Sequence, residues 1–222
     1  MLLAIDTSTA QIGLALYDGT SVPGEFVWQS GLHHTEELAP ALADLLRRVD
    51  IKMEAITALG VAIGPGSFTS LRVGLAFVKG LILARHIPVA GIPTLDIVAA
   101  AMPLSDQRLA AVVRAGRGRL AVGWYSAGER EWQSEGPATV RTADELAEEI
   151  HSPVIVCGEL SADERHRLQR KFKNVSLASP AQCVRRPGIL AELAWQKWQA
   201  GKLDPAAALA PIYLHVAGGL PA

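Results

Sequence analysis

The sequence predicts an α/β protein with mixed sheets flanked by helices, and three observations lead to this fold class. Three strand-like segments follow one another at the N-terminus, at residues 2–7, 12–18 and 22–29. Strand-like and helix-like segments then alternate as far as residue 101. After residue 102 the pattern starts again with paired strand-like segments. Successive strands favour an antiparallel start, and the later alternation favours parallel strands joined by helices.

The first three strands follow from their residues. Segment 2–7 is Leu-Leu-Ala-Ile-Asp-Thr, an apolar run that is typical of a buried strand. Asp18 and Gly19 form a hairpin signal between the second and third strands, because glycine tolerates the positive φ of tight hairpin turns. We therefore expect an antiparallel meander.

Residues 35–49 are predicted to form an amphipathic helix. Its apolar residues recur at spacings of three and four, at Leu38, Ala41, Leu42, Leu45 and Val49. Acidic residues near its start and arginines near its end suit the helix dipole. A strand at 56–64, a helix at 68–85, a strand at 87–92 and a helix at 93–101 are expected to follow.

A break around residues 102–107, which contains Pro103 and Asp106, marks the predicted domain boundary. We expect residues 1–102, joined by the C-terminal segment 203–222, to form one lobe, and residues 103–202 to form a second α/β lobe. The second lobe is predicted to contain strands at 109–113, 120–125, 131–134 and 153–158, and helices at 143–150, 162–172 and 188–200.

Composition restricts the class of protein. Half of the 222 residues are hydrophobic and the net charge is −1, so bulk electrostatics do not favour nucleic acid or membrane as a partner. Cys157 and Cys183 stand alone, which favours a reducing compartment over a disulfide framework or a zinc cluster. The N-terminus has no basic region typical of a signal peptide, and the longest apolar run is too short to span a membrane. We expect a cytoplasmic protein.

The stretch GPGSFTSLRVG, at residues 64–74, precedes the helix at 68–85. Glycine-rich loops at helix N-termini can bind phosphate. A phosphate loop of the Walker type also needs a lysine after its last glycine, and here the first lysine is Lys79. Ser67 is well placed to cap the helix. A structural helix entry is therefore favoured, with phosphate binding as the alternative.

Three stretches together resemble the bacterial tRNA threonylcarbamoyladenosine biosynthesis subunit TsaB, the YeaZ family. They are LLAIDTSTAQIGLAL at the N-terminus, GPGSFTSLRVGLAFVKGL in the middle and PIYL near the end. The resemblance is dense over residues 1–102 and weak over 103–209. It implies the two-lobed actin/hexokinase/Hsp70-like (ASKHA) fold with a reduced second lobe. This chain departs from the family at Ser70, where glycine is usual, and at Arg114, where the family has an acid.

The resemblance also implies a function and partners. A TsaB-like chain is a non-catalytic subunit needed to place N6-threonylcarbamoyladenosine at adenosine 37 of tRNAs that read codons beginning with adenine. Its implied partners are the catalytic paralogue TsaD and the small ATPase TsaE, with a homodimer when the chain is alone. tRNA is expected to be met through this complex, and no membrane is involved. The alternative is an independent actin-like ATPase or small-molecule kinase.

Asp6, Thr7, Ser8 and Gly66 are the weak candidates for nucleotide binding. In the superfamily that the chain resembles, residues after the first strand contact metal-bound phosphates. The sequence after residue 103 contains no second glycine-rich phosphate motif. We therefore expect no cofactor.

A metal site and protease chemistry are a further alternative. The catalytic paralogue carries a helical His-x-x-x-His, and Thr94 and Val98 stand at the matching positions here. Neither side chain can replace an imidazole as a metal ligand. His33 and His34 are adjacent, so we expect a helix cap or an exposed pair. No metal is expected.

The helix at 68–85 is apolar almost all round, and only Arg72 and Lys79 interrupt it. Such a helix is buried on more than one side. We therefore predict a partner interface formed with the helix at 35–49, and an ordinary three-layer core is the alternative. The predicted interface residues are Leu38, Ala41, Leu42, Leu45, Leu71, Gly74, Leu75 and Val78. Substituting Gly74 or Leu75 is expected to disrupt the partner complex and to leave the fold intact.

Basic residues form three clusters in the second half of the chain. Such clusters are usually solvated faces, and phosphate contact with tRNA is the alternative interpretation. The clusters contain Arg165, Arg167, Arg170, Lys171 and Lys173, then Arg185 and Arg186, and then Arg114, Arg117 and Arg119.

Overall fold

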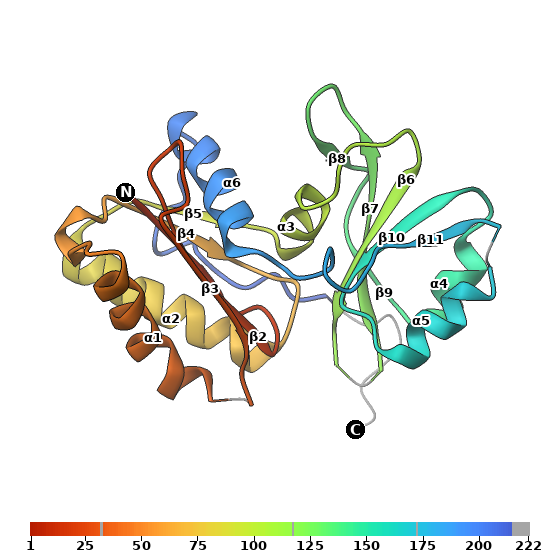
Figure 1. Cartoon of the computed structure of the whole chain (residues 1–222), viewed down its shortest axis with the longest axis horizontal. Helices are drawn as coiled ribbons and strands as arrows, with labels where there is room; N and C mark the ends of the chain where they lie inside the picture. Colours follow the sequence, from red (N-terminus) through yellow and green to blue (C-terminus); the bar gives the residue numbers. More distant parts are fainter. Residues whose placement is uncertain (32, 117, 172, 215–222) are drawn as a thin grey trace. The chain divides into compact units, whose positions relative to one another are not determined.

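The computed structural model of the chain describes all residues except 32, 117, 172 and 215–222. It contains two sheets, and each sheet mixes parallel and antiparallel strands and is flanked by helices (Figure 1). The predicted α/β fold class is therefore confirmed. None of the helices in the described part of the chain is both long and apolar enough to cross a membrane.

The chain divides into two units. Unit 1 contains Met1–Ile97 and Arg185–Ile212, and unit 2 contains Val98–Val184 with residues 213 and 214. The predicted second lobe, residues 103–202, differs from unit 2 at its C-terminal end. The final helix packs against the sheet of unit 1, so residues 185–202 belong to that unit. The predicted boundary also moves from residue 102 to residue 97.

Five strands form the sheet of unit 1 in the order β3-β2-β1-β4-β5. They are β1 (Leu2–Asp6), β2 (Gln11–Tyr17), β3 (Gly24–Gln29), β4 (Ala58–Ala62) and β5 (Val89–Ile92). The first three strands pair antiparallel, which confirms the predicted meander. β4 pairs parallel with β1 and with β5, as the strand and helix alternation predicted. A short 3-10 helix before β4, Met53–Ala55, was not predicted.

Helices cover both faces of this sheet. They are α1 (His34–Arg48), α2 (Phe68–Arg85) and α6 (Pro187–Gln199). Because side chains alternate along a strand, Leu3 and Ile5 of β1 join the core that contains α1 and α2. Leu2 and Ala4 point to the opposite face, where they pack against α6. Figure 1 shows α1 and α2 together on one side of the sheet and α6 on the other.

The outer edge of β5 is occupied by the segment that follows α6. Asp204 N donates to Val89 O at 3.0 Å, and the Asp204 carboxylate accepts from Gly91 N at 2.7 Å. Lys197 Nζ donates to the same carboxylate at 2.7 Å and to Gly91 O at 3.1 Å. These polar groups of the edge strand thus have partners although no sixth strand is present.

Unit 2 has its own sheet, in the order β11-β10-β6-β7-β8, with β9 paired to β7. The strands are β6 (Arg108–Arg114), β7 (Leu120–Ala127), β8 (Trp132–Ser134), β9 (Thr139–Arg141), β10 (Val154–Gly158) and β11 (Val175–Leu177). The helices are α3 (Thr94–Ala100), which crosses the boundary between the units, α4 (Ala143–Glu149) and α5 (Ala162–Gln169). Capping boxes begin α4 at Thr142 and α5 at Ser161.

Three details of unit 2 differ from the prediction. β9 and β11, of three residues each, were not predicted. The helix predicted over 162–172 ends at Gln169, and residue 172 lies outside the described residues.

Candidate functional site

The C-terminal end of β1 leads into a cluster of buried polar side chains. Asp6, Thr7, Ser8 and Thr9 are each at most 4% exposed. Asp6 Oδ1 accepts hydrogen bonds from Ser8 N at 2.8 Å and from Ser8 Oγ at 2.6 Å. A carboxylate that binds the backbone two residues further on is typical of a tight turn. Three of the candidate nucleotide-binding residues thus lie together, inside the unit.

Arg185 binds the other oxygen of Asp6. Its side chain is 1% exposed, and its Nε donates to Asp6 Oδ2 at 2.5 Å. Its Nη2 lies 3.1 Å from Thr9 Oγ1 and 3.4 Å from Gln11 O. The guanidinium is therefore the counter-ion of Asp6.

Two glycines allow α2 and its N-terminal loop to approach this cluster closely. A Cβ atom on Gly66 would lie 2.1 Å from Ser8 O, and one on Gly74 would lie 2.2 Å from Thr7 Oγ1. Ser67 N also donates to Ser8 O at 2.7 Å. Gly66 and Gly74 are therefore required by packing within unit 1. Gly74, which the sequence analysis assigned to a partner interface, thus has a packing role within unit 1.

The glycine-containing stretch starts α2, as predicted. Ser67 is the N-cap residue, and its Oγ accepts from Ser70 N at 3.5 Å. Ser70, where the family usually has glycine, donates from its Oγ to Ser67 Oγ at 3.0 Å. Its carbonyl accepts from Thr7 Oγ1 at 2.8 Å. The hydroxyl of Ser70 thus joins the cap.

Thr94 completes the cluster. Its Oγ1 donates to Ser8 Oγ at 2.8 Å and accepts from Gly64 N at 3.1 Å. Val98, four residues further along α3, is 5% exposed. Among the described residues, no group of three or more His, Cys, Asp or Glu side chains is placed to hold a metal ion.

Most of the predicted interface residues are buried within unit 1. Gly74 is buried, Ala41 is half-buried, and the other six are at most 6% exposed: Leu38, Leu42, Leu45, Leu71, Leu75 and Val78. Five of them, Leu38, Leu42, Leu45, Leu75 and Val78, pack in one core with residues of the sheet. Among the predicted interface residues, Leu38 also lines the groove that lies on the other sides of the two helices.

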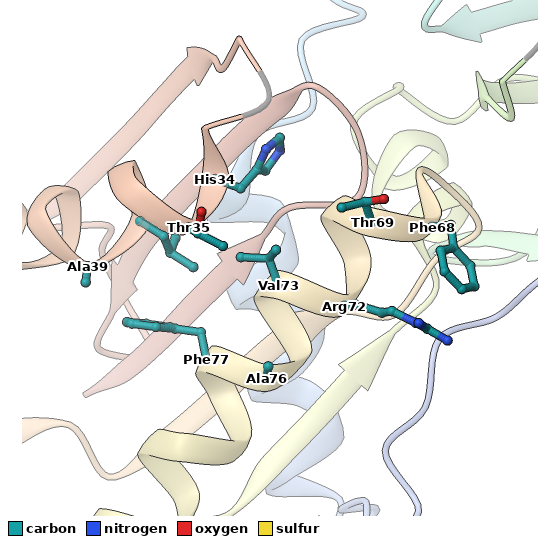
Figure 2. A pocket seen from close by; sticks show the side chains of 10 residues that line it. His34, Thr35, Ala39, Phe68, Thr69, Arg72, Val73, Ala76 and Phe77 are labelled. Carbon is teal, nitrogen blue, oxygen red and sulfur yellow. The ribbon is translucent and has the colours of Figure 1, made fainter.

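The outer sides of α1 and α2 enclose a groove of about 480 Å³. Its lining residues are His34, Thr35, Leu38, Ala39, Phe68, Thr69, Arg72, Val73, Ala76 and Phe77. Figure 2 shows Val73 and Phe77 pointing from α2 towards α1, and Ala76 on α2 beside Phe77. Phe68 is 52% exposed, and Leu83, further along α2, is 77% exposed. This exposed apolar surface is typical of a binding site for another protein.

His34 connects the groove to the buried polar cluster. It lies at the groove and is 3% exposed, and its Nε2 is 2.8 Å from Thr9 O. His33 is the N-cap residue of α1 and is exposed. The expectation of a cap or an exposed pair therefore holds for His33 only, because the start of α1 packs onto the turn after β1.

Other predicted features lie elsewhere. Arg167 pairs with Asp144 at 2.5 Å and with Asp163 at 2.8 Å, so this arginine of the α5 cluster is balanced by carboxylates.

Burial raises the pKa of the Cys157 thiol, which removes it as a nucleophile at neutral pH. Arg117 lies outside the described residues.

The sequence prediction did not identify Arg185 or His34 as parts of this site. Arg185 was assigned to a basic surface pair, but its partner Asp6 is 179 residues away. No local spacing could have revealed this contact. The burial of His34 also depends on a tertiary contact.

Comparison with known proteins places the chain among tRNA-modifying proteins. A family model described as TsaD, tRNA N6-adenosine threonylcarbamoyltransferase, matches residues 29–182. The chain is 28% identical over 220 residues to the tRNA threonylcarbamoyladenosine biosynthesis protein TsaB of Bacillus subtilis, covering 97% of this chain and 94% of that protein. It is 35% identical over 98 residues to TsaB of Escherichia coli, covering 44% and 42% of the two chains.

A solved structure has the same fold. YeaZ from Pseudomonas aeruginosa superposes with a TM-score of 0.79 at 24% sequence identity, covering 96% of this chain and 99% of that one. The fold described above therefore extends over almost all of both chains.

Proposed function

We infer the function of this chain from its family. The chain belongs to the family of TsaD, tRNA N6-adenosine threonylcarbamoyltransferase. Within this family it is of the TsaB, or YeaZ, type, and its fold is that of the actin-like superfamily. Its role is in the biosynthesis of threonylcarbamoyladenosine in tRNA. We propose that it acts as a non-catalytic subunit required for the modification of adenosine 37 in tRNAs that read codons beginning with adenine.

The proposed partners are the catalytic paralogue TsaD and the small ATPase TsaE, in the cytoplasm. The chain holds the catalytic subunit in a competent arrangement, and tRNA is met through the complex. Without that partner the chain pairs with a second copy of itself. Binding energy, rather than a chemical step on this chain, is then its contribution to the reaction.

The groove between α1 and α2 is the observation that carries this proposal. Its lining includes the exposed residues Phe68 and Ala76 and the half-buried Val73 and Phe77. Contact by another protein would remove this apolar surface from water, which is favourable by roughly 25 cal/mol per Å². The interface residues proposed here are therefore the groove residues, which share Leu38 with the positions that the sequence suggested.

The buried polar cluster supports a non-catalytic role. Asp6 is neutralised by Arg185, and Ser8 O is packed against Gly66. A nucleotide with its metal ion would have to displace this ion pair and these contacts. We therefore assign the cluster a structural role in joining β1, α2 and the segment before α6.

The proposal is tested by placing a charge in the groove. Ala76→Glu is expected to weaken association with purified TsaD by about 30-fold or more, because docking would bury an unpaired carboxylate. Ala200→Glu is the matched control, since Ala200 is exposed at the end of α6, on the opposite face of the sheet. Calorimetric titration gives the dissociation constants, and unfolding curves check that both variants fold.

The same variants can be examined in cells that depend on this chain. Ala76→Glu should lower the threonylcarbamoyladenosine content of hydrolysed tRNA, whereas Ala200→Glu should leave it unchanged. Wild-type affinity for TsaD in the Ala76→Glu variant would contradict docking at the groove.

A further inference from the structure

β3 is an edge strand whose outer side is open. Among the described strands it pairs with β2 only, and the register between the two is unbroken from Gly24 to Gln29. Natural edge strands usually avoid pairing with another chain through a lysine, a proline, a bulge or a covering segment. β3 contains neither lysine nor proline, and no described segment covers it as Asp204 covers β5. This edge can therefore accept another strand.

The backbone groups of alternate residues in β3 point to the open side. Ser30 N donates to Ala10 O at 2.8 Å, which continues the antiparallel ladder between β2 and β3. Because the hydrogen-bonding groups along such a strand alternate in direction, those of Val27 and Gln29 point away from β2. Val27, near the middle of the strand, is 36% exposed. A second strand would therefore form its hydrogen bonds at these residues.

A second copy of β3 is complementary to this edge. Two antiparallel copies related by a two-fold axis at Val27 would exchange the N–H and C=O groups of Val27 itself. Phe26 of each copy would then lie opposite Trp28 of the other, on the face that α1 covers. Aromatic pairs across strands are stabilising. Glu25 would lie opposite Gln29, whereas a register centred on Glu25 would place two like charges opposite each other.

The charges of α1 are complementary in the same arrangement. In the first turn of α1, Glu37 accepts from Trp28 Nε1 at 2.7 Å, and in its last turn Arg48 Cζ lies 5.8 Å from the centre of the Phe26 ring. A register that places Phe26 opposite Trp28 therefore brings Arg48 of one copy towards Glu37 of the other. Arg48 also pairs with Asp44 of its own chain at 2.7 Å, and its side chain is 60% exposed. Opposite charges thus meet at both ends of the contact.

We propose that β3 and the adjoining side of α1 form the surface through which two copies of this chain pair, in an antiparallel contact of β3 with β3. This inference deepens one part of the proposed function, the pairing with a second copy, and rests on it. The surface differs from the groove, whose α1 residues are His34, Thr35, Leu38 and Ala39. A second copy and the catalytic subunit therefore use different surfaces of unit 1.

Val27→Pro tests the contact between the strands. Proline removes an N–H group that points to the open side, where an edge strand tolerates it, so the ladder with β2 should remain. In sedimentation equilibrium of the chain alone, the dimer dissociation constant should rise by about 30-fold or more, because the central hydrogen bonds are lost. Val27→Thr is the matched control. It keeps the N–H group and the branched Cβ atom, and it should dimerise as wild type does.

Charge reversal tests the contact between the helices. Arg48→Glu and Glu37→Arg each place like charges opposite one another, and each should raise the dimer dissociation constant by about tenfold. The double variant restores opposite charges in reversed order and should return to within about threefold of wild type. A double variant weaker than both single variants would show that the two residues do not meet across the contact, which would overturn the proposed register.

Amide hydrogen exchange locates the contact in the wild-type chain and so does not depend on the folding of a variant. Exchange in β3 should slow by about tenfold or more as the chain concentration passes the dimer dissociation constant. Exchange in α6, on the other face of the sheet, should not change and is the internal control. Concentration-dependent protection at the start of α2 in place of β3 would put the second copy at the groove and overturn the inference.

The outcomes separate this inference from the proposed function. Loss of dimers in Ala76→Glu, with wild-type pairing of Val27→Pro, would place the second copy in the groove and overturn the inference alone. Weaker binding of purified TsaD by Val27→Pro, titrated where the chain is monomeric, would assign the β3 edge to the catalytic subunit and also overturn it. A wild-type chain that stays monomeric at every concentration would overturn the inference together with self-pairing, whereas docking of TsaD at the groove is decided by Ala76→Glu.

Discussion

Arg185 and Asp6 are an ion pair with both side chains 1% exposed. Each charge on its own would be strongly unfavourable in this environment, because water is excluded from both. The pair joins the turn after β1 to the segment that leads into α6. It therefore acts as a structural tie between two parts of unit 1 that are far apart in the sequence.

The first prediction concerns this pair. Arg185→Met is expected to lower the free energy of unfolding by about 3–5 kcal/mol, because it leaves the Asp6 carboxylate buried without a counter-ion. The double variant Asp6→Asn with Arg185→Met should lose less than the sum of the two single changes. Urea unfolding of the four proteins measures this coupling.

Arg186 is the matched control for that experiment. It is the next residue and also pairs with a carboxylate, Glu25, but 60% of its side chain is exposed. Arg186→Met should therefore cost about 1 kcal/mol or less. Equal losses for the two arginine variants would show that the buried pair has no special role.

The second prediction concerns pH. Trp28 Nε1 donates to Glu37 Oε2 at 2.7 Å, and this bond lowers the pKa of the Glu37 carboxyl. A lowered folded-state pKa contributes stability that is complete above the unfolded pKa of about 4.3 and is lost as the pH falls through the folded pKa. The stability difference between wild type and Trp28→Phe should therefore shrink below about pH 4.3.

Glu37→Gln provides the comparison for the pH series, because it removes the titrating group and keeps the length of the side chain. The unfolding free energy of Glu37→Gln, measured from pH 7 to pH 3, should converge on the wild-type value below about pH 4.3. A constant difference between wild type and Trp28→Phe over this range would argue against the hydrogen bond as its cause.

At the scale of the element, α2 has two sides with different roles. Leu75 and Val78 belong to the core that α2 shares with the sheet, whereas Phe68 and Leu83 are exposed. Both sides are apolar, so the helix contributes to the core and still leaves apolar surface for a partner. The buried side fixes its position, and the outer side forms the groove with α1.

The third prediction compares the two glycines of α2. Gly74→Ala should destabilise unit 1 by about 1–3 kcal/mol, because the added Cβ atom meets Thr7 Oγ1 at 2.2 Å. The Cβ atom that Gly80→Ala adds has no atom within 4 Å, so this substitution should stabilise the helix by about 0.5–1 kcal/mol. Thermal unfolding distinguishes the two, and a loss of similar size in both would contradict the packing described here.

The bounds of the long helices could be predicted from the sequence. The predicted helix at 35–49 is observed at His34–Arg48, because its apolar residues recur with helical spacing. The helix at 68–85 is observed with the same bounds, because Ser67 is an evident cap. Which side of this second helix faces the sheet could not be predicted, since apolar residues surround it and give no preferred face.

The candidate site was predictable only in part. The helix entry at Ser67 was predicted from a local motif. The contact of Arg185 with Asp6 could not be predicted, because it depends on where α6 returns along the chain. The same long-range contact explains why the predicted second lobe extended too far, to residue 202.

At the scale of the whole molecule, each unit has a sheet and a core of its own. The buried polar cluster and the groove both belong to unit 1, which is formed from two separate stretches of the chain, Met1–Ile97 and Arg185–Ile212. Unit 2 provides neither. Binding of the proposed partner and the buried polar cluster therefore depend on the same unit. A substitution that unfolds unit 1 would abolish both.

The fourth prediction concerns nucleotide. Because both oxygens of Asp6 are engaged by Arg185 and Ser8, we expect titration calorimetry to detect no micromolar binding of magnesium-ATP by this chain alone. ATP without magnesium is the control for heats of dilution. Saturable binding with turnover would instead favour an independent actin-like ATPase or small-molecule kinase.

The contacts of Asp204 with the last strand have a consequence for polymerisation. A sheet grows into a fibre only if both of its margins can accept a neighbouring chain. In unit 1 the margin at Val89 and Gly91 is already bonded to Asp204 and Lys197. Strand addition through the sheet of unit 1 alone is therefore limited to the opposite margin, β3, and could join at most two molecules.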